Sequence, residues 1–395
     1  MDLDASHDPF RYLSVFTFSC LKASNYKSSD NSVEMPIHLE EVDSLEAIVI
    51  IDNELDPLSP PAPDTVQVSG NLGAIAMGSK HTLTDRGEAC KELRLEDVCC
   101  AAHGLSILVT ATKGNKKHTI LFDAGPEEEA WERNVKRLRP NLSSVEVIHL
   151  SHWHRDHSGG LLRAIRMIND AKRAESRSGD LVADLHPDRP VYRGIALPSH
   201  IISLEADPTF EAIGNAGAVV DKRSEPHTVL DDFFLVSGEI PRVTPYETGL
   251  KNAVRYDPDE NDWFSDEVIV DERSLICNLK GICILKPAHK DIEITYSLGK
   301  GLVVLTGCSH AGVVNTTKHA VELAGGMVPV HAVIGGFHLA TSDADQIQDT
   351  IADLKGLDPA VLMPGHCSGW RAKFAIEKHM PGSLVPCTVG SRITF

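Results

Sequence analysis

The segment at residues 145–168 constrains the fold more than any other part of the chain. It begins with a β-branched run, Val145–Leu150, continues through a histidine-rich polar stretch, and ends in Leu161–Ile168, where apolar residues recur at helical spacing. The first run fits a buried strand. A strand that opens into a polar loop and then a helix is the place where open α/β sheets position their chemistry. The segment therefore predicts sheets, helices and a functional site at the end of this strand.

The polar stretch has the residue types of a metal site. His152, His154, Asp156 and His157 occupy four of six consecutive positions. Imidazole nitrogens and carboxylate oxygens suit zinc, and also iron or manganese. The alternative is a polar turn of surface histidines that caps a helix, although such turns rarely follow a buried strand. We therefore expect these four side chains to bind metal.

Similar patterns predict the rest of the secondary structure. Strands are expected at Ala47–Ile51, Leu105–Thr110, Thr119–Phe122, Phe233–Val236, Ser274–Leu279, Gly301–Thr306, Val330–Ile334 and Ala360–Met363. Helices are expected at Glu127–Leu138 and Leu161–Ile168, and from near Val313 and Asp343, the last with Ser342 as its N-cap. Each half of the chain thus combines strands and helices, which favours a four-layer αββα sandwich over a single doubly wound sheet.

Two segments differ from this pattern. Residues 1–44 show no clear period, and we expect an N-terminal extension that is partly disordered. Residues 175–275 are charged and rich in Pro and Gly, with an acidic stretch at 257–262 that is expected to be solvated surface. This length of irregular chain predicts an insertion or cover over a site between the two halves of a 45–395 domain.

The motifs resemble those of a known family. The stretch 151–160 resembles the signature of the metallo-β-lactamase-fold superfamily, and the chain is similar to one branch, the dihydropterin-methyl-ribofuranosylaminobenzene-phosphate-synthase-like group of metal-dependent hydrolases. The stretches that carry the branch resemblance are Asp52-Asn53, His103–Ser106, Ile120–Gly125, Ser237–Arg242, Thr306–Thr316, Ile334–Leu339 and Pro364–Trp370. In order and spacing they cover about 45–395.

This resemblance implies an αββα sandwich, the metallo-β-lactamase fold, with metals at the sheet edge. It implies that His152 and His154 hold a first metal, and that Asp156, His157 and His366 hold a second. His310 is inferred to complete the first set from a displaced position. Cys308 stands at the turn where the family usually has a metal-bridging Asp, so no obvious bridging carboxylate remains. Zinc is expected, as one or two ions, with manganese or iron as alternatives.

Four further residues are candidates for roles beside the metal ligands, as positioning or substrate-contact residues. Asp123, at a strand end, is expected to orient a ligand histidine by accepting its second N–H. His338 is expected to contact substrate or a leaving group, and His103 to lie near substrate; a buried structural histidine is the alternative for each. Cys308 is expected beside the ligands, with a small buried thiol as the commoner explanation.

Composition and charge limit the expected partners and cellular location of the protein. Lys plus Arg total 38 and Asp plus Glu total 56, so the net charge is −18, which disfavours nucleic acid as a general partner. The nine cysteines form no CxxC pair, which argues against a disulfide framework and favours a reducing compartment. No apolar run reaches the roughly 18 residues of a membrane span, and the acidic N-terminus lacks a signal-peptide pattern. We expect a cytoplasmic enzyme with a small-molecule substrate.

The main functional hypothesis is a metal-dependent hydrolase. A metal-activated water would cleave an ester, lactone, amide or phosphoester bond, with Asp156 as the residue that orients it and His338 as the donor to the leaving group. One alternative is a synthase or transferase that acts on a pterin-type phosphoribosyl substrate. Further alternatives are an iron-dependent oxidoreductase on the same scaffold and a non-catalytic metal-binding protein.

Overall fold

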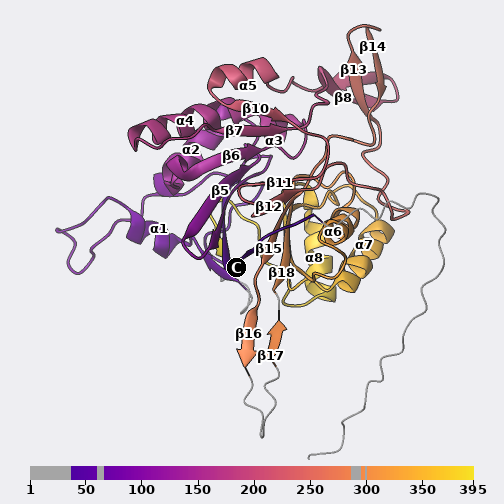
Figure 1. Ribbon diagram of the computed structural model, residues 1–395. Helices are drawn as coiled ribbons and strands as arrows, with labels where there is room; N and C mark the ends of the chain where they lie inside the picture. The colour runs from indigo at the N-terminus through magenta and orange to yellow at the C-terminus, as the bar shows by residue number, and fades with distance from the viewer. Residues whose placement is uncertain (1–36, 60–65, 286–294, 299) are drawn as a thin grey trace, which may run out of the picture. The chain divides into compact units, whose positions relative to one another are not determined.

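Two large sheets packed face to face form the centre of the protein in the computed structural model, which describes residues 37–59, 66–285, 295–298 and 300–395 (Figure 1). The predicted extension at 1–44 therefore lies mostly outside the described residues. Its described end contains strand β1 (Glu41–Val42), which pairs in parallel with β15 (Leu275–Leu279).

The first sheet has eight strands and is built mainly from the first half of the chain. Its order is β10 (Val219–Lys222), β7 (Val182–Leu185), β6 (Val145–His149), β5 (Lys116–Phe122), β4 (Ser106–Lys113), β2 (Ser44–Ile51), β21 (Arg392–Thr394) and β3 (Gln67–Ser69). The pairs from β10 to β5 are parallel, and those from β5 to β3 are antiparallel. The C-terminal strand β21 thus returns to the sheet of the other half.

The second sheet has seven strands. Its order is β11 (His227–Val229), β12 (Phe234–Val236), β15, β18 (Gly301–Thr306), β19 (Val330–Gly336) and β20 (Val361–Gly365), with β1 on β15. Strands β18, β19 and β20 run parallel, so their carboxyl ends meet at one edge.

Apolar side chains on both faces of the strands create three buried layers. Between the sheets, Phe122 and Val109 of the first sheet and Leu305 and Val303 of the second belong to one fully buried cluster. Burial of this kind contributes roughly 25 cal/mol per Å2 of apolar surface removed from water. The helices cover the outer faces.

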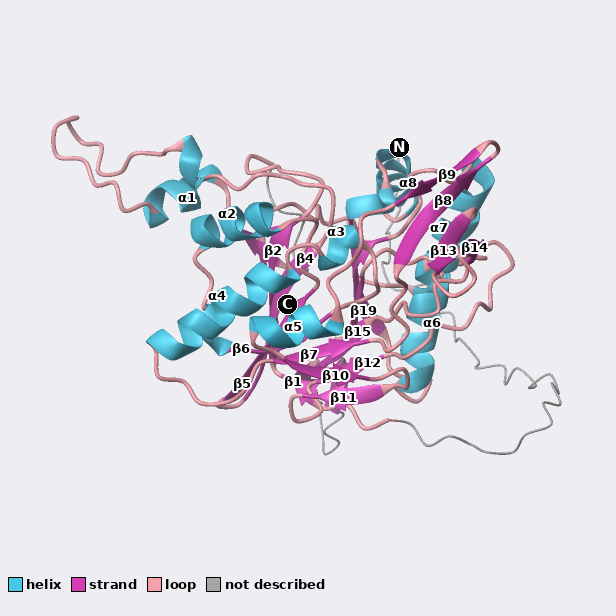
Figure 2. Ribbon diagram, turned by 90° about the horizontal axis from the view of Figure 1, so that it is seen from above, coloured by secondary structure: helices cyan, strands magenta, loops and turns pink. Residues whose placement is uncertain are grey.

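The outer faces carry one helical layer each (Figures 1 and 2). On the first sheet these helices are α2 (Glu128–Leu138), α4 (Leu161–Ala174) and α5 (Phe210–Ala216), and on the second α6 (Val313–Leu323), α7 (Ala344–Leu357) and α8 (Trp370–His379). Trp131 of α2 and Ile165 of α4 pack with Ile148 of β6, and Ile351 of α7 packs with Val333 of β19. The predicted αββα sandwich is confirmed.

The remaining elements are short. They are helices α1 (Leu72–Gly78) and α3 (Arg155–Ser158), the 3-10 turns Leu95–Asp97, Leu142–Ser144 and His366–Ser368, and the hairpin β16 (Ile282–Leu285)–β17 (Thr295–Leu298). The N-cap of α7 differs from the expectation of Ser342. Asp343 takes that place because its backbone is extended and its carboxylate accepts the N–H of Gln346 at 2.8 Å. In the described part of the chain, no helix has the length and apolar character that a membrane crossing requires.

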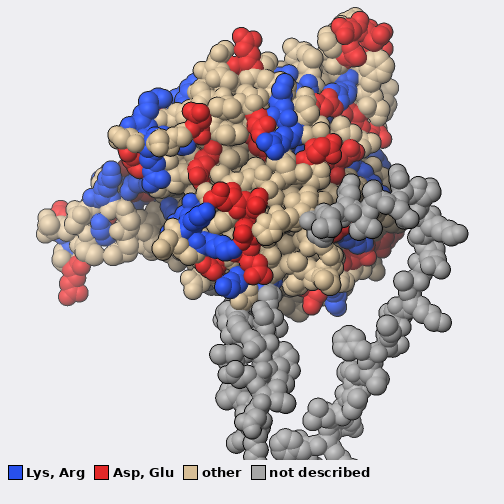
Figure 3. Space-filling model, viewed as in Figure 1, with Lys and Arg blue, Asp and Glu red and all other residues tan. Residues whose placement is uncertain are grey.

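Residues 175–275 contain more structure than the single strand expected there. Strands β7, β10, β11 and β12 belong to the two large sheets, and a separate four-stranded sheet has the order β14 (Asp262–Ser265), β13 (Ala253–Asp257), β8 (Tyr192–Leu197) and β9 (His200–Ser203). Acidic side chains gather at the tip of the β13–β14 hairpin, where 258–262 are exposed, in line with the expected solvated surface (Figure 3). Whether this segment is an insertion remains a prediction.

Candidate metal centre

The candidate residues project from loops at the carboxyl ends of strands in both sheets. His152, His154, Asp156 and His157 follow β6, whereas Cys308 and His310 follow β18. His338 follows β19, and His366 follows β20. Parallel strands bring these loops to one edge, so residues more than 150 positions apart lie side by side.

Three imidazoles form the first cluster. Nε2 of His152 lies 2.9 Å from Nδ1 of His154, and Nε2 of His310 lies 3.2 Å from each of these atoms. Nitrogen ligands about 2.05 Å from a tetrahedral zinc ion would be about 3.3 Å apart. The spacing of the three nitrogens therefore fits the face of one coordination polyhedron.

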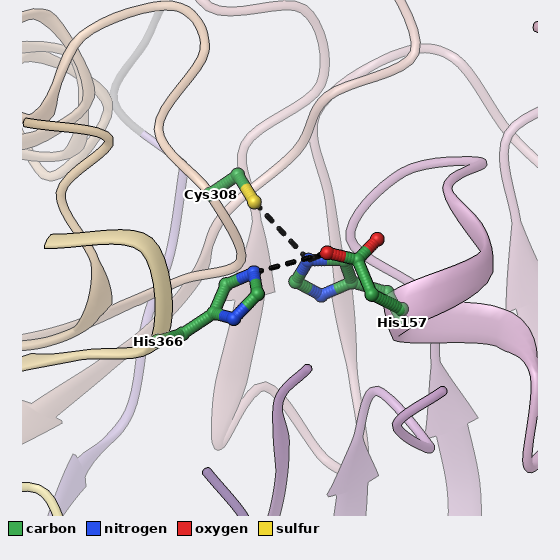
Figure 4. Close-up of side chains that lie close together, drawn as sticks. His157, Cys308 and His366 are labelled. Atoms are coloured by element: carbon green, nitrogen blue, oxygen red, sulfur yellow. Dashed lines mark hydrogen bonds and ion pairs between the residues drawn. The ribbon is translucent and has the colours of Figure 1, made fainter. Parts of the chain in front are cut away.

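A second cluster adjoins the first, and Figure 4 shows three of its side chains, His157, Cys308 and His366. His157, Cys308, His366 and the neighbouring Asp156 offer donor atoms that all lie within 4.8 Å of one another. Nε2 of His157 is 3.2 Å from the Cys308 sulfur, and Nε2 of His366 is 3.2 Å from Oδ2 of Asp156. The sulfur of Cys308 also belongs to a group with His152 and His310. Cys308 thus lies between the two clusters, a more central place than the position beside the ligands expected from the sequence.

The hydrogen bonds of His366 test whether a cation fits. Oδ1 of Asn53 accepts the backbone N–H of Gly104 at 3.0 Å, so the same oxygen must accept Nδ1–H of His366, also at 3.0 Å. Nε2 of His366 then carries a lone pair, is buried with no hydrogen-bond partner among the residues that the structure describes, and faces the Asp156 carboxylate. A lone pair held against a carboxylate is unfavourable unless a cation lies between them. The donor set therefore fits a metal ion.

Electrostatics in the metal-free chain agree with this. Burial lowers the pKa of His154 to about 3 and that of His366 to about 4, and holds those of His152 and His310 well below the usual value. These rings are neutral near pH 7, as metal ligands must be. For His157, burial opposes a charge, but Asp123 and Asp156 outweigh it and raise the pKa to about 9. The second cluster thus attracts positive charge.

Asp123 supports both clusters from a fully buried position. Its Oδ2 lies 2.7 Å from Nδ1 of His157 and accepts the hydroxyl of Ser151 at 2.8 Å. The Ser151 hydroxyl oxygen in turn lies 2.9 Å from Nδ1 of His152. Such contacts fix the orientation of a ligand ring and raise its basicity.

Three consecutive charged residues that the sequence analysis missed hold the ligand loops in place. Oδ2 of Asp271 accepts the backbone N–H of Trp153 at 2.7 Å. The Glu272 carboxylate accepts the backbone N–H groups of His310 at 2.7 Å and Ala311 at 2.6 Å. Arg273 is fully buried and donates to the carbonyl of Leu150 at 3.0 Å. A run of three charges directly before a buried strand was the signal that could have revealed them.

Arg193 of β8 is a second missed residue. It is buried, pairs with Asp266 and Asp271, and donates to the carbonyl of Trp153 at 2.7 Å. Trp153 lies between two candidate ligands, so the ion pair connects the four-stranded sheet to the ligand loop.

A cavity of about 790 Å3 opens over the cluster. It is lined at its base by His154, Asp156, Cys308, His310 and His366, and at its sides by β8, β13 and the start of α8. His338 and His103 also line it, so both expected substrate-contact residues border this space. The His338 ring lies 4.5 Å from that of His310, and burial lowers its pKa. The exposed His103 ring lies 4.9 Å from that of His366.

The chain is similar in sequence to known proteins. The family model described as the metallo-β-lactamase superfamily matches residues 101–253. A 7,8-dihydropterin-6-methyl-4-(β-D-ribofuranosyl)-aminobenzene-5′-phosphate synthase of Methanocaldococcus jannaschii is 29% identical over 293 residues, which are 74% of this chain and 90% of that protein. An uncharacterized protein of the same organism is 26% identical over 274 residues, 69% of this chain and 86% of the relative.

A solved structure supports the fold. The crystal structure of a metal-dependent hydrolase of the β-lactamase superfamily aligns with a TM-score of 0.57, 18% sequence identity, and coverage of 88% of this chain and 98% of the other. At this identity the likeness bears on the fold alone.

The synthase relative corrects the expectation of a hydrolase. Its similarity extends over most of the chain, and its name describes a synthase, which agrees with the alternative hypothesis. The sequence motifs led to the wrong reaction because the histidines and carboxylates indicate only that a metal is bound. They do not indicate whether water or another substrate attacks the bond that is broken. The match of the family model to residues 101–253 and the shared fold make the chain similar to the metallo-β-lactamase superfamily, and this similarity supports an enzyme that binds metal ions.

Proposed function

We propose that the protein is a metal-dependent synthase or transferase that acts on a pterin-type phosphoribosyl substrate. The observation that carries the proposal is the 29% identity to the synthase over 90% of that protein, combined with the cluster of donor atoms at the base of one large cavity. The name of that relative describes a product that contains a dihydropterin, an aminobenzene ring and ribose 5′-phosphate.

The cavity has the size and charge for such a substrate. Its volume of about 790 Å3 lies within the range of roughly 300–1,000 Å3 found for small-molecule sites. Arg155 is the cation we assign to the phosphate. Among the described residues its Nε has no hydrogen-bond partner. Its Nη1 donates to the carbonyl of Ala206 at 3.2 Å, and its Nη2 pairs with Glu205, whose side chain is 71% exposed. Arg193 pairs with two buried carboxylates, so its guanidinium is not available to bind the phosphate.

We assign the metal ligands as His152, His154 and His310 for one ion and Asp156, His157 and His366 for a second, with Cys308 between them. Zinc is the proposed ion because imidazole and thiolate ligands both suit it. A bound ion would stabilise negative charge that develops on a phosphate or pyrophosphate oxygen. His338, whose neutral ring faces the cavity, would hydrogen-bond to the substrate beside it. Asp156 is kept as a ligand, without the part in water activation that belonged to a hydrolase.

A coupling assay tests the proposal. Zinc-loaded protein is incubated with a pyrophosphate-activated fragment, either ribose 5-phosphate 1-pyrophosphate or the pyrophosphate ester of a 6-hydroxymethyl-dihydropterin, and with an aminobenzene acceptor. In the coupling step the C–O bond to pyrophosphate breaks, a bond from that carbon to the acceptor forms, and the acceptor loses a proton. Mass spectrometry follows the coupled product, and a second assay follows released pyrophosphate. We expect both to form in equal amounts, and His154→Ala to lose both together with bound zinc. Release of pyrophosphate without any coupled product would contradict a synthase.

A further inference from the structure

The aromatic ring of Trp370 stands exposed beside the cavity. Trp370 is the first residue of α8, it lines the cavity wall, and its side chain is 67% exposed. Phe374, one helical turn later, is 68% exposed and lies edge-on to it, with ring centres 5.8 Å apart. Exposed aromatic surface of this kind, continuous with a cavity, marks a binding site more often than a packing defect.

The backbone that carries Trp370 is tightly held although its side chain is largely exposed. Gly369 has φ +78°, and a Cβ there would lie 2.6 Å from the Cα of Ala340, so this turn has almost no freedom. In the same first turn, Arg371 donates to the carbonyl of Ser342 at 3.2 Å, and Lys373 pairs with Glu54 at 2.6 Å. A fixed backbone with an unburied ring is a preorganised surface for a ligand.

The surroundings favour a flat, largely apolar ligand at this place. Ile195 of β8 and Leu250 and Val254 at β13 line the same cavity, whereas the polar candidate ligands lie at its base. In Figure 2, α8 and the four-stranded sheet lie on the same side of the described unit, and residues of both line the cavity. An aromatic platform within an aliphatic wall suits a planar conjugated ring, because stacking needs a face and no specific hydrogen bonds.

We infer that Trp370 is a substrate-binding residue that stacks on a planar ring of the substrate, the dihydropterin or the aminobenzene, at the outer end of the cavity. This inference rests on the proposed function for the identity of the ring, and on the exposed Trp370 for its position. The phosphate end would then lie toward Arg155, and the reacting atoms toward the donor cluster.

Isothermal titration of the zinc-loaded full chain with 6-methyl-7,8-dihydropterin and with 4-aminobenzoate tests the inference. We expect Trp370→Ala to weaken binding of at least one of them about tenfold. Trp370→Phe should restore most of the affinity, because it keeps a ring of similar orientation. Phe374→Ala is the matched control: this residue is equally exposed and adjacent but does not line the cavity, so affinity should stay within about twofold.

The outcomes separate this inference from the proposed function. If the wild type binds the pterin or the aminobenzoate and Trp370→Ala binds it equally well, the stacking role is overturned while the function stands. If neither binds but a different planar ligand, adenosine, binds in a Trp370-dependent way, the stacking role stands and the pterin assignment fails. If Trp370→Ala changes only self-association in analytical ultracentrifugation, the ring is a protein contact and the inference is wrong.

Discussion

Asp123 and His157 form a fully buried pair, with Oδ2 of the carboxylate 2.7 Å from Nδ1 of the ring. The carboxylate also accepts the backbone N–H of Ser151 at 2.8 Å, so one side chain fixes both a candidate ligand and the start of the ligand loop. Asp123 itself has φ +57°, a conformation that the native contacts must maintain.

Asp123→Asn is expected to weaken zinc affinity about 10- to 100-fold, because the amide accepts a weaker hydrogen bond and leaves His157 less basic and less oriented. The measurement is competition with a fluorescent chelator. Thr110→Val, which removes a neutral side-chain hydrogen bond to Thr119 in the same sheet, serves as the control. Equal zinc affinities for the wild type and Asp123→Asn would show that the pair has no part in metal binding.

Cys308→Ala is expected to lower the zinc content to one ion or fewer per chain, from up to two in the wild type. The sulfur belongs to both donor groups, so its removal takes one donor atom from each. Elemental analysis after dialysis gives the stoichiometry. Cys367→Ala is the control, since its thiol lies 3.5 Å from the Cys308 carbonyl and outside both groups. If Cys308→Ala bound as much zinc as the wild type, Cys308 would be a buried packing residue and not a metal ligand.

The ion pair of Asp271 with Arg193 predicts an acid-dependent loss of stability. Burial would raise the pKa of Asp271, but the Arg193 guanidinium outweighs it and lowers the pKa to about 2. A carboxyl whose pKa is lowered by folding stabilises the protein above its unfolded value of 3.8 and loses that contribution as the pH falls toward 2. The contribution at stake is about 2 kcal/mol.

Urea unfolding of the zinc-free chain between pH 2 and 5 measures it. Asp271→Asn should be less stable than the wild type by about 3 kcal/mol at pH 5, because Arg193 keeps a buried charge with one partner fewer, and the difference should shrink toward pH 2. Asp259→Asn, on the exposed tip of the β13–β14 hairpin, should match the wild type throughout. A difference for Asp271→Asn that stayed constant with pH would contradict the assigned ionisation.

Gly159→Ala tests the close packing beneath the ligand loop. A Cβ at this position would lie 1.8 Å from the carbonyl oxygen of Pro126, so the backbone must shift. We expect a loss of about 2–3 kcal/mol in unfolding free energy, measured by urea titration with zinc present. Gly214→Ala, within α5 and with open space around its Cβ, should instead gain about 0.5–1 kcal/mol. Equal stability of the two variants would show that the loop tolerates the shift.

The sequence predicted the elements that carry strong local signals. Buried β-branched runs gave β6, β18 and β19 to within a few residues, and helical spacing predicted α2 and the start of α4. The strands of the four-stranded sheet were missed because that sheet is partly exposed. Tyr192, Ile195 and Phe264 are each more than 40% exposed, so alternation between a buried and a solvated face is weak.

Some residues of the candidate site could be predicted from the sequence, and others could not. Histidines that follow predicted strands could be recognised as a group, since topology brings strand ends together. The support from Arg193 and Asp271 could not be recognised, because these residues lie 78 positions apart and only the folded sheets make them neighbours. The position of Cys308 between the two donor groups likewise depends on the packing of the two large sheets.

The donor atoms of each group come from both halves of the chain, from loops after β6 in one sheet and after β18 or β20 in the other. An ion bound there would connect the two sheets. Because it binds the folded state and not the unfolded one, its binding free energy would add to the stability of the fold. We therefore expect a shortage of the metal to make the protein more susceptible to proteolysis as well as to lower its activity.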